Sequence, residues 1–438
     1  MSDWADLCRQ QRYALLCAFL FVLVVVAYGS SLQLPFLSDD YVQIRLARIY
    51  GPPAGWPSLM KDPLYRCRSV SLVHTWLTEQ WFGLNPLAFH IASVFLHFLN
   101  CLLVAGLGIW RKVGWSVSVP ASAFFAVFER PQEAVIWHAA SPELEVFAFA
   151  ILNILIWTVW VQDREQFRKP AHRLVLMSGF LLSFFFALLS KESGAILPVL
   201  LLVVLVVEGE KDRRSYLPLL PLFGVSIAYF LAGYVSKSDH LHYNDGTFSL
   251  TAPFWYTLPA SLVRLLGIWG LAAVALLLFL RRATFLQPAL ACLAFAAVAL
   301  VPYSFVAYMP RVPSRHTYMA SAAVAILIGF AASSLWNSFW PKRKLALLAI
   351  ASTVLLSNIG YLWAWKMPQY WRRAAPTEEL VQRIRDGRKP VKVLCFPYSA
   401  YTAESAVLIA GGQSSDLTMN IRKACPPDDA EFADSGER

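Results

Sequence analysis

The chain has 438 residues, of which 57% are hydrophobic and only 15% are charged, and its mean hydropathy is +0.50. Soluble domains carry about 25% charged residues, so this composition excludes an ordinary soluble enzyme. The net charge of +10 does not indicate nucleic-acid binding, because the basic residues form short clusters between apolar runs, which is how membrane proteins signal their orientation.

Apolar runs near 20 residues long recur along the chain, and a helix of that length spans a bilayer core. Lipid offers no partner for a free backbone N–H group, so these runs must be helices. They are blocks of Leu, Val, Phe and Ala without alternation, which argues against an outer-membrane barrel. We therefore predict an all-α polytopic membrane protein with about eleven transmembrane helices, near residues 13–33, 87–109, 116–128, 143–161, 173–190, 194–208, 216–235, 255–280, 286–307, 317–337 and 345–365.

Basic clusters lie between alternate spans. The loops that carry them contain Arg9 and Arg12, Arg111 and Lys112, Arg164, Arg168, Lys169 and Arg173, Lys211, Arg213 and Arg214, Arg281 and Arg282, and Lys342, Arg343 and Lys344. The positive-inside rule places these loops and the N-terminus in the cytoplasm. With an odd number of spans, the C-terminal tail then lies on the other side of the membrane.

The first outer loop, residues 34–86, is long and contains two amphipathic stretches. Val42–Tyr50 and Ser69–Phe82 both have the pattern of helices that lie in the membrane interface. This loop is therefore expected to form a layer over the ends of the spans.

The tail changes composition, and we divide the chain into a transmembrane domain, 1–365, and a small extracytoplasmic α/β module, 366–438, whose last dozen residues read as disordered. Its predicted elements are a helix at Thr377–Arg388, a strand at Val391–Phe396 and a helix at Ala403–Ala410. Cys395 and Cys425 both fall in the tail and can pair if it lies outside the cytoplasm, but the sequence leaves that pairing open.

Charged residues at membrane depth are costly, so they are functional candidates. Asp39 and Asp40 follow the first span and offer a general base or a cation site, the alternative being a helix N-cap. Arg66 and Arg68 flank one residue and offer a phosphate clamp, the alternative being contact with lipid headgroups.

Three further groups lie on the predicted outer side. Glu133 precedes Trp137 and His138 in a short polar loop that also reads as an ordinary turn. Lys191 and Glu192 sit in a very short connection between two apolar runs, where a solvated loop is unusual, so function is favoured. The remaining charged or polar residues at the spans are Arg315 and Tyr318, which open the tenth span, and Arg264, which lies inside the eighth and needs a carboxylate or a phosphate as partner.

Metal and nucleotide signatures are weak. Asp239, His240, His242 and Asp245 are potential metal ligands, but their loop reads as an ordinary polar one. No Walker, dinucleotide-binding or H-E-x-x-H motif appears. We expect no cofactor, and a divalent metal stays open.

Several motifs in order resemble the GT-C membrane glycosyltransferases, chiefly the protein O-mannosyltransferase and TMTC-type group, with the aminoarabinose transferases more distant. The run Tyr65-Arg66, Gly83-Leu84-Asn85-Pro86, His90 and His97 is similar to the family's Y-R-P … G-L-N-P-x-x-F-H … H pattern, with Cys67 in place of its proline. Pro131–Trp137 is similar to P-x-x-x-E-A-V-x-W, and Ser190–Pro198 is similar to S-K-E-x-G … P. The late Glu and the tetratricopeptide repeats of the TMTC type are absent.

The resemblance implies an inverting glycosyltransferase that takes its sugar from a polyprenyl- or dolichyl-phosphate donor. Asp39 or Asp40 then acts as the general base toward an acceptor hydroxyl. The roles implied for the rest are phosphate binding by Lys191, Arg66, Arg68, Arg315 and Tyr318, and acceptor binding or orientation by Glu133, Glu192, His138 and Arg264.

The partners implied are the lipid-linked sugar donor, a glycan, lipid or protein acceptor, and the bilayer, with no nucleic acid. The missing repeats and small tail favour a bacterial inner membrane with a periplasmic C-terminus over the endoplasmic reticulum. The main alternative function is a transporter or flippase of a lipid-linked sugar, which would show internal repeats and more charges within its spans.

Overall fold

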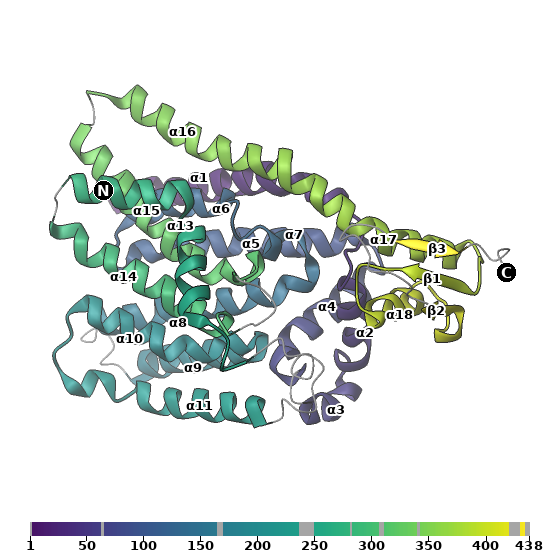
Figure 1. Cartoon of the computed structure of the whole chain (residues 1–438). Coiled ribbons are helices and arrows are strands. Elements are labelled where there is room, and N and C mark those ends of the chain that lie inside the picture. The colour runs from purple at the N-terminus through teal and green to yellow at the C-terminus, as the bar shows by residue number, and fades with distance from the viewer. Residues whose placement is uncertain are drawn as a thin grey trace.

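The computed structural model describes residues 2–62, 65–163, 170–235, 249–280, 283–305, 311–339, 342–419 and 430–433. A helix bundle forms most of the molecule, and a small module at one end carries the C-terminus, while the N-terminus lies at the opposite end (Figure 1). The bundle helices are α1 (Ser2–Tyr28), α5 (Pro86–Gly106), α6 (Trp115–Val127), α7 (Glu133–Ile136), α8 (Ser141–Gln162), α9 (Pro170–Ser190), α10 (Leu197–Glu208), α11 (Leu219–Val235), α13 (Phe254–Phe279), α14 (Ala283–Leu300), α15 (Tyr318–Phe339) and α16 (Lys344–Tyr361).

The polytopic all-α architecture is confirmed. Eight helices in the described residues are long and apolar enough to cross a membrane: Gln11–Gln33, Pro86–Ile109, His138–Gln162, Ala171–Ser190, Arg213–Ala232, Phe254–Phe279, Ser314–Phe339 and Lys344–Arg385. The other three expected spans correspond to α6, α10 and α14. Since α6 and α10 have 13 and 12 residues and a helix rises 1.5 Å per residue, both fall short of a core about 30 Å thick. Helix α14 has 18 residues and continues into a 3-10 turn at Val301–Tyr303, which is within the length of a spanning helix. The number of eleven spans is therefore not confirmed.

Helix α15 lies at the centre of the bundle, and 78% of its most apolar stretch is buried. Gly329 allows it to approach α6 closely, because a Cβ at this position would lie 2.3 Å from the carbonyl oxygen of Val117. Some polar groups bond to one another within the bundle: the hydroxyl of Tyr318, at the start of α15, bonds to His97 at 2.7 Å and to Asn100 at 3.2 Å. The bundle is therefore a packed core that positions the loops and short helices at its ends.

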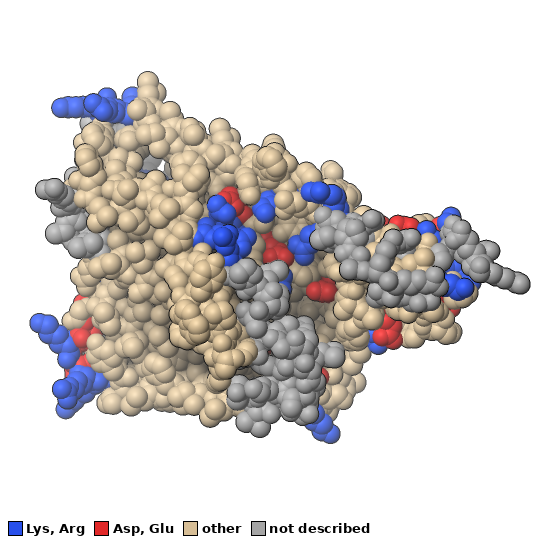
Figure 2. Space-filling view, in the orientation of Figure 1, with Lys and Arg blue, Asp and Glu red and all other residues tan. Residues whose placement is uncertain are grey.

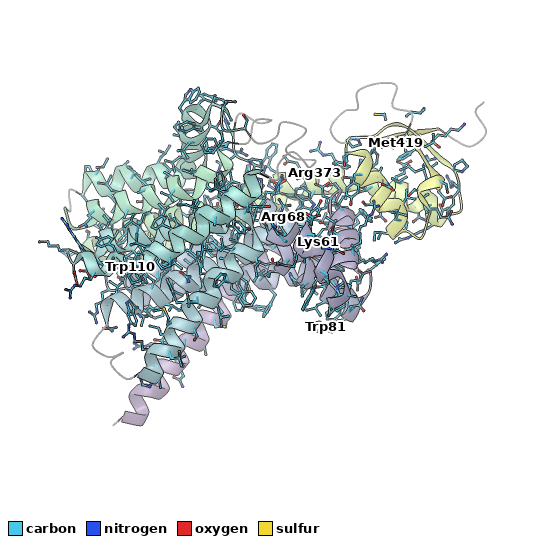
Figure 3. All side chains as sticks on the ribbon, turned by 90° about the horizontal axis from the view of Figure 1, so that it is seen from below. Lys61, Arg68, Trp81, Trp110, Arg373 and Met419 are labelled. Atoms are coloured by element: carbon cyan, nitrogen blue, oxygen red, sulfur yellow. The ribbon has the colours of Figure 1, made fainter. Side chains whose placement is uncertain are left out.

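A layer of short helices covers one end of the bundle, as the sequence predicted for the first loop. It consists of α2 (Asp40–Tyr50), α3 (Trp56–Lys61) and α4 (Ser69–Phe82). Large apolar side chains of this layer are exposed, among them Met60 and Trp81, which suits contact with lipid headgroups. Figure 3 shows Lys61, Trp81, Arg68 and Arg373 near this end and Trp110 at the other.

The C-terminal module is built on α17 (Met367–Arg385), with β1 (Val391–Cys395), α18 (Ala400–Ile409), β2 (Leu417–Met419) and β3 (Glu431–Ala433). Its sheet has the order β2-β1-β3, with β1 parallel to β2 and antiparallel to β3. The predicted helix, strand and helix of the tail are thus present. Residues 344–385 form one helical segment that passes from the bundle into the module, so the expected boundary at residue 366 falls inside it.

Several residues singled out in the sequence lie outside the described part of the chain. The possible metal ligands Asp239, His240, His242 and Asp245, and the basic residues Arg164, Arg168, Lys169, Arg281 and Arg282, lie outside the described residues. Cys395 is disulfide-bonded, while Cys425, the partner considered from the sequence, is also outside them. Figure 2 shows groups of Lys and Arg at the end of the bundle remote from the module, as the alternating loop pattern predicts.

Candidate active site

The two adjacent carboxylates at the start of α2 have opposite environments. Asp40 is fully buried, whereas Asp39 is exposed. Ser38 precedes them with φ +32°, a region that residues with a side chain seldom adopt. This turn directs one carboxylate inward and leaves the other at the surface.

Asp40 is held by two backbone donors. Its Oδ2 accepts from the N–H group of Leu37 at 2.8 Å, and its Oδ1 accepts from that of Ala139 at 2.7 Å. Burial raises the pKa of Asp40 to about 7, and the negative charge of Asp39 adds to this, while the two backbone hydrogen bonds and Arg373 oppose it. Asp40 therefore ties the start of α2 to the loop before α8, and Asp39 is the carboxylate available to a ligand.

Glu133 binds two arginines from different parts of the chain. Its Oε1 accepts from Arg315 at 3.2 Å and from Arg373 at 3.1 Å. Each guanidinium lies 4.9 Å from the ring centre of Trp137, whose indole N–H donates to the Leu37 carbonyl at 3.2 Å. Burial favours the neutral acid, but the two arginines outweigh it and lower the pKa of Glu133. This cluster joins α7, α17 and the turn Ser314–Thr317, which precedes α15, beside the Asp39 turn.

A second basic group lies next to it. Arg264, on α13, lies in the electrostatic field of two arginines and two acids, namely Arg130, Arg311, Glu129 and Glu133. Lys366 is within electrostatic reach of the same two acids and of Arg264 and Arg130. Arg130 pairs with Glu129 at 2.7 Å. Within the part of the chain that the structure describes, no carboxylate lies in ion-pair distance of the remaining three cations: Arg264, Arg311 and Lys366. We call these three residues the cation group.

A break in α13 shapes the surroundings of the cation group. Gly267 has φ +52° and ψ −155° inside the helix, a backbone conformation that glycine adopts without steric cost. A Cβ at this position would lie 3.3 Å from an Nη atom of Arg130. The break thus lets the Arg130 side chain lie against the helix backbone, three residues beyond Arg264.

Figure 2 shows basic and acidic side chains gathered where the surface is hollowed, between the bundle and the C-terminal module. Three cations that lack a carboxylate partner produce a local excess of positive charge. Such a place at the edge of a membrane suits a doubly or singly charged phosphate.

Lys191 is bound within a buried network. Its Nζ lies 2.6 Å from Oε1 of Glu143, whose Oε2 accepts from the Tyr303 hydroxyl at 2.7 Å. His316 also bonds to Glu143, and its ring stacks on Tyr303 with centres 4.4 Å apart. Burial lowers the pKa of Lys191 against the opposing attraction of Glu143. The partner of Lys191 is therefore Glu143 on α8 rather than the adjacent Glu192.

Glu192 instead pairs with Arg68, at 3.1 Å between Oε1 and Nε. Burial alone would raise the pKa of Glu192, but Arg68 and Lys191 lower it. Arg66 is half-buried, and its backbone N–H donates to Asp62 at 3.3 Å. The expected Tyr-Arg-x-Arg segment thus meets the Lys-Glu connection.

Two predicted site residues are packed in the interior. His138 is fully buried, 3.1 Å from the Thr75 hydroxyl and 3.4 Å from that of Ser93. Tyr318 is likewise fully buried on its His97 and Asn100 partners. Neither side chain reaches the hollow.

Five residues of the site were not predicted from the sequence. Glu143 opens α8, and its Ser-Pro-Glu context reads as an ordinary helix start. Arg130 directly precedes the Pro131–Trp137 motif. Arg311, Lys366 and Arg373 come from late segments, and the only signal for them was a positive charge near the predicted outer end of a span. No group of three or more His, Cys, Asp or Glu side chains in the described residues has the arrangement of a metal site.

No known family model and no curated protein matches the sequence. Among solved structures, ArnT from Cupriavidus metallidurans bound to undecaprenyl phosphate is similar with a TM-score of 0.56 at 15% identity, over 92% of this chain and 85% of ArnT. The archaeal oligosaccharyltransferase AglB from Archaeoglobus fulgidus, in complex with an inhibitory peptide and a dolichol-phosphate, gives 0.55 at 12% identity over 86% of this chain. The chain spans 58% of the length of AglB.

At this identity the similarity establishes only that the chain shares the fold of these two structures. It does not separate the protein O-mannosyltransferase and TMTC-type group, expected from the motifs, from the other members of the fold.

Proposed function

We propose that this chain is an inverting glycosyltransferase that moves a sugar from a polyprenyl-phosphate donor to an acceptor hydroxyl. The observation that carries the proposal is an exposed carboxylate, Asp39, on a turn whose Leu37 carbonyl accepts from Trp137. Trp137 lies against the two arginines that bind Glu133, and Glu133 is within electrostatic reach of Arg264 and Lys366. A base and an unpaired basic site are the two elements that such a transfer needs. The GT-C fold supports the same class of reaction.

The chemistry assigns separate roles to the two parts of the site. Asp39 takes the proton of the acceptor hydroxyl as its oxygen attacks the anomeric carbon. The bond from that carbon to the phosphate oxygen breaks, and its electrons leave with the polyprenyl phosphate. One displacement inverts the anomeric configuration.

The growing charge on the phosphate is stabilised by the cation group, Arg264, Arg311 and Lys366. Arg315 and Lys191 are already bound by Glu133 and Glu143, so they stabilise the positions of these neighbours and add a longer-range positive potential. Arg68 is likewise paired, with Glu192. The proposal takes this end of the bundle as the extracytoplasmic one, because the basic groups gather at the opposite end.

The test is donor turnover by the purified protein in lipid nanodiscs. Radiolabelled polyprenyl-phosphate hexoses are offered with a membrane extract as acceptor, and wild type is compared with Asp39→Asn and with the control Asp163→Asn at the far end of α8. We expect wild type and the control to consume donor, and Asp39→Asn to bind donor without consuming it. Donor that binds but is never consumed, or that reaches the opposite face of sealed vesicles unchanged, contradicts the transferase and supports a lipid-sugar transporter.

A further inference from the structure

The C-terminal module contacts the Asp39 turn through the first turn of α18. Arg45 of α2 lies 4.8 Å from the ring centre of Tyr401 and 3.3 Å from a carboxylate oxygen of Glu404. Thr402, between them, is 1% exposed. The start of α18 is thus held against α2 by contacts on both sides of Thr402.

Thr402 donates a hydrogen bond from its hydroxyl to Oδ1 of Asp39, at 3.0 Å. Its oxygen also lies 2.9 Å from the hydroxyl of Ser399, which accepts from the backbone N–H of Thr402 at 3.1 Å. An ionised carboxylate can only accept, so the single proton of Thr402 goes to Asp39, and Ser399 donates to Thr402 in turn. The result is a short relay that starts at the N-cap of α18 and ends on Asp39.

This contact distinguishes the two oxygens of an exposed carboxylate. Oδ1 is occupied by Thr402, and within the described residues no hydrogen bond to Oδ2 is present. A surface aspartate without such a contact samples several rotamers. With Oδ1 fixed, the Asp39 side chain is held in one orientation, and Oδ2 is the oxygen left for the acceptor proton.

We infer that Thr402 of the C-terminal module is a positioning residue for Asp39, so that the module completes the site in the first loop of the membrane domain. This inference rests on the proposed function of Asp39 as the base. It assigns the module a direct part in the reaction, beyond that of an attached domain.

The experiment compares Thr402→Val, which keeps the shape and removes the hydroxyl, with Thr402→Ser, which retains it. Glu404→Gln is the control, because it weakens the docking of α18 on Arg45 without touching Asp39. For Thr402→Val we expect kcat to fall about tenfold or more with the KM for donor unchanged, since one orienting hydrogen bond to a charged group is lost. Thr402→Ser retains most of the rate, and Glu404→Gln leaves it near that of wild type.

A further readout separates positioning from folding. Labelling of Asp39 by a water-soluble carbodiimide, followed by peptide mass spectrometry, rises in Thr402→Val because the carboxylate is no longer held by the hydroxyl, and this measurement needs no turnover.

The outcomes distinguish the inference from the proposal beneath it. Turnover and labelling of Thr402→Val equal to those of wild type overturn the inference and leave the transferase intact. If kcat falls equally in Thr402→Val and Glu404→Gln, the contact serves only to dock the module, and the inference is wrong. If kcat rises in Thr402→Val, the contact inhibits the reaction, which also contradicts the inference. Increased labelling in a protein that never consumes donor contradicts the transferase, while the contact itself stands.

Discussion

Arg315 and Arg373 bind the same carboxylate oxygen, Oε1 of Glu133, at 3.2 and 3.1 Å. One arginine precedes the central helix of the bundle and the other lies on the helix that enters the C-terminal module. A single buried acid therefore joins the two parts of the molecule at the edge of the hollow.

Replacing Glu133 by Gln should destabilise the protein strongly. The change leaves two arginines without their counter-charge in a partly buried place, which costs about 3 kcal/mol or more of unfolding free energy. Glu404→Gln, which breaks an ion pair with a more exposed acid, should cost about 0–1 kcal/mol. Thermal unfolding in detergent measures both, and equal shifts would show that Glu133 does not join the two parts.

Neutralising Arg264 or Lys366 should weaken the binding of polyprenyl phosphate about tenfold each, because neither has a carboxylate partner among the described residues. The matched control is Arg111→Gln, whose ion pair with Asp163 lies at the other end of the bundle. Binding is measured in nanodiscs at two salt concentrations, and added salt should weaken it most in wild type. Unchanged affinity in Arg264→Gln and Lys366→Gln would place the phosphate elsewhere.

The buried carboxyl of Asp40 gives a pH prediction with a definite sign. Its pKa is raised from 3.8 to about 7 by burial, so the folded state binds the proton more tightly than the unfolded state. The stability from this group is complete below pH 4 and is lost as the pH rises through 7. The melting temperature of wild type minus that of Asp40→Asn should therefore shrink between pH 5 and pH 8. A constant difference would contradict the shifted pKa.

The Lys191–Glu143 pair permits a double-variant test. Lys191→Met alone leaves Glu143 buried without its lysine and should cost roughly 3–5 kcal/mol of unfolding free energy. Adding Glu143→Gln removes that charge and should restore much of the loss. Thermal unfolding follows stability, while donor turnover tests whether activity returns with it. If the double variant is stable and fully active, Lys191 has only a structural role.

The break in α13 predicts the effect of a small change. Gly267→Ala places a Cβ at φ +52° and 3.3 Å from an Nη atom of Arg130, so we expect a loss of about 1–3 kcal/mol in stability and weaker donor binding. Gly360→Ala in α16 meets no atom within 4 Å and replaces glycine in a helix interior, so it should be neutral or slightly stabilising. Similar melting temperatures for the two variants would contradict the strain at Gly267.

Hydropathy alone predicted most of the architecture, because each long apolar run has only one way to satisfy its backbone in lipid. The number of spans was harder to predict, since the apolar runs at α6 and α10 resemble spans in composition but form helices of only 13 and 12 residues. Whether such a helix crosses or ends inside the bundle depends on its neighbours, which local sequence does not contain.

The sequence pointed to most residues of the candidate site but only in part to the ion pairs that they form. The sequence identified Asp39 and Asp40 together, and their difference arises from the tertiary contacts of Asp40 with Leu37 and Ala139. It related Lys191 to the adjacent Glu192, although the geometry of the turn directs these side chains to Glu143 and Arg68. Arg373 was missed because it lies on the helix that leaves the bundle, and only the folded chain brings its side chain back to Glu133.

The unbroken helical segment Lys344–Arg385 carries Lys366 and Arg373 on its way into the module. A shortened chain that ends at residue 365 would keep all the bundle helices but would lose Lys366 from the cation group and Arg373 from Glu133. The module therefore cannot be exchanged between related chains as an independent unit. A chimera would have to inherit the whole of this helix from the same parent as the first loop.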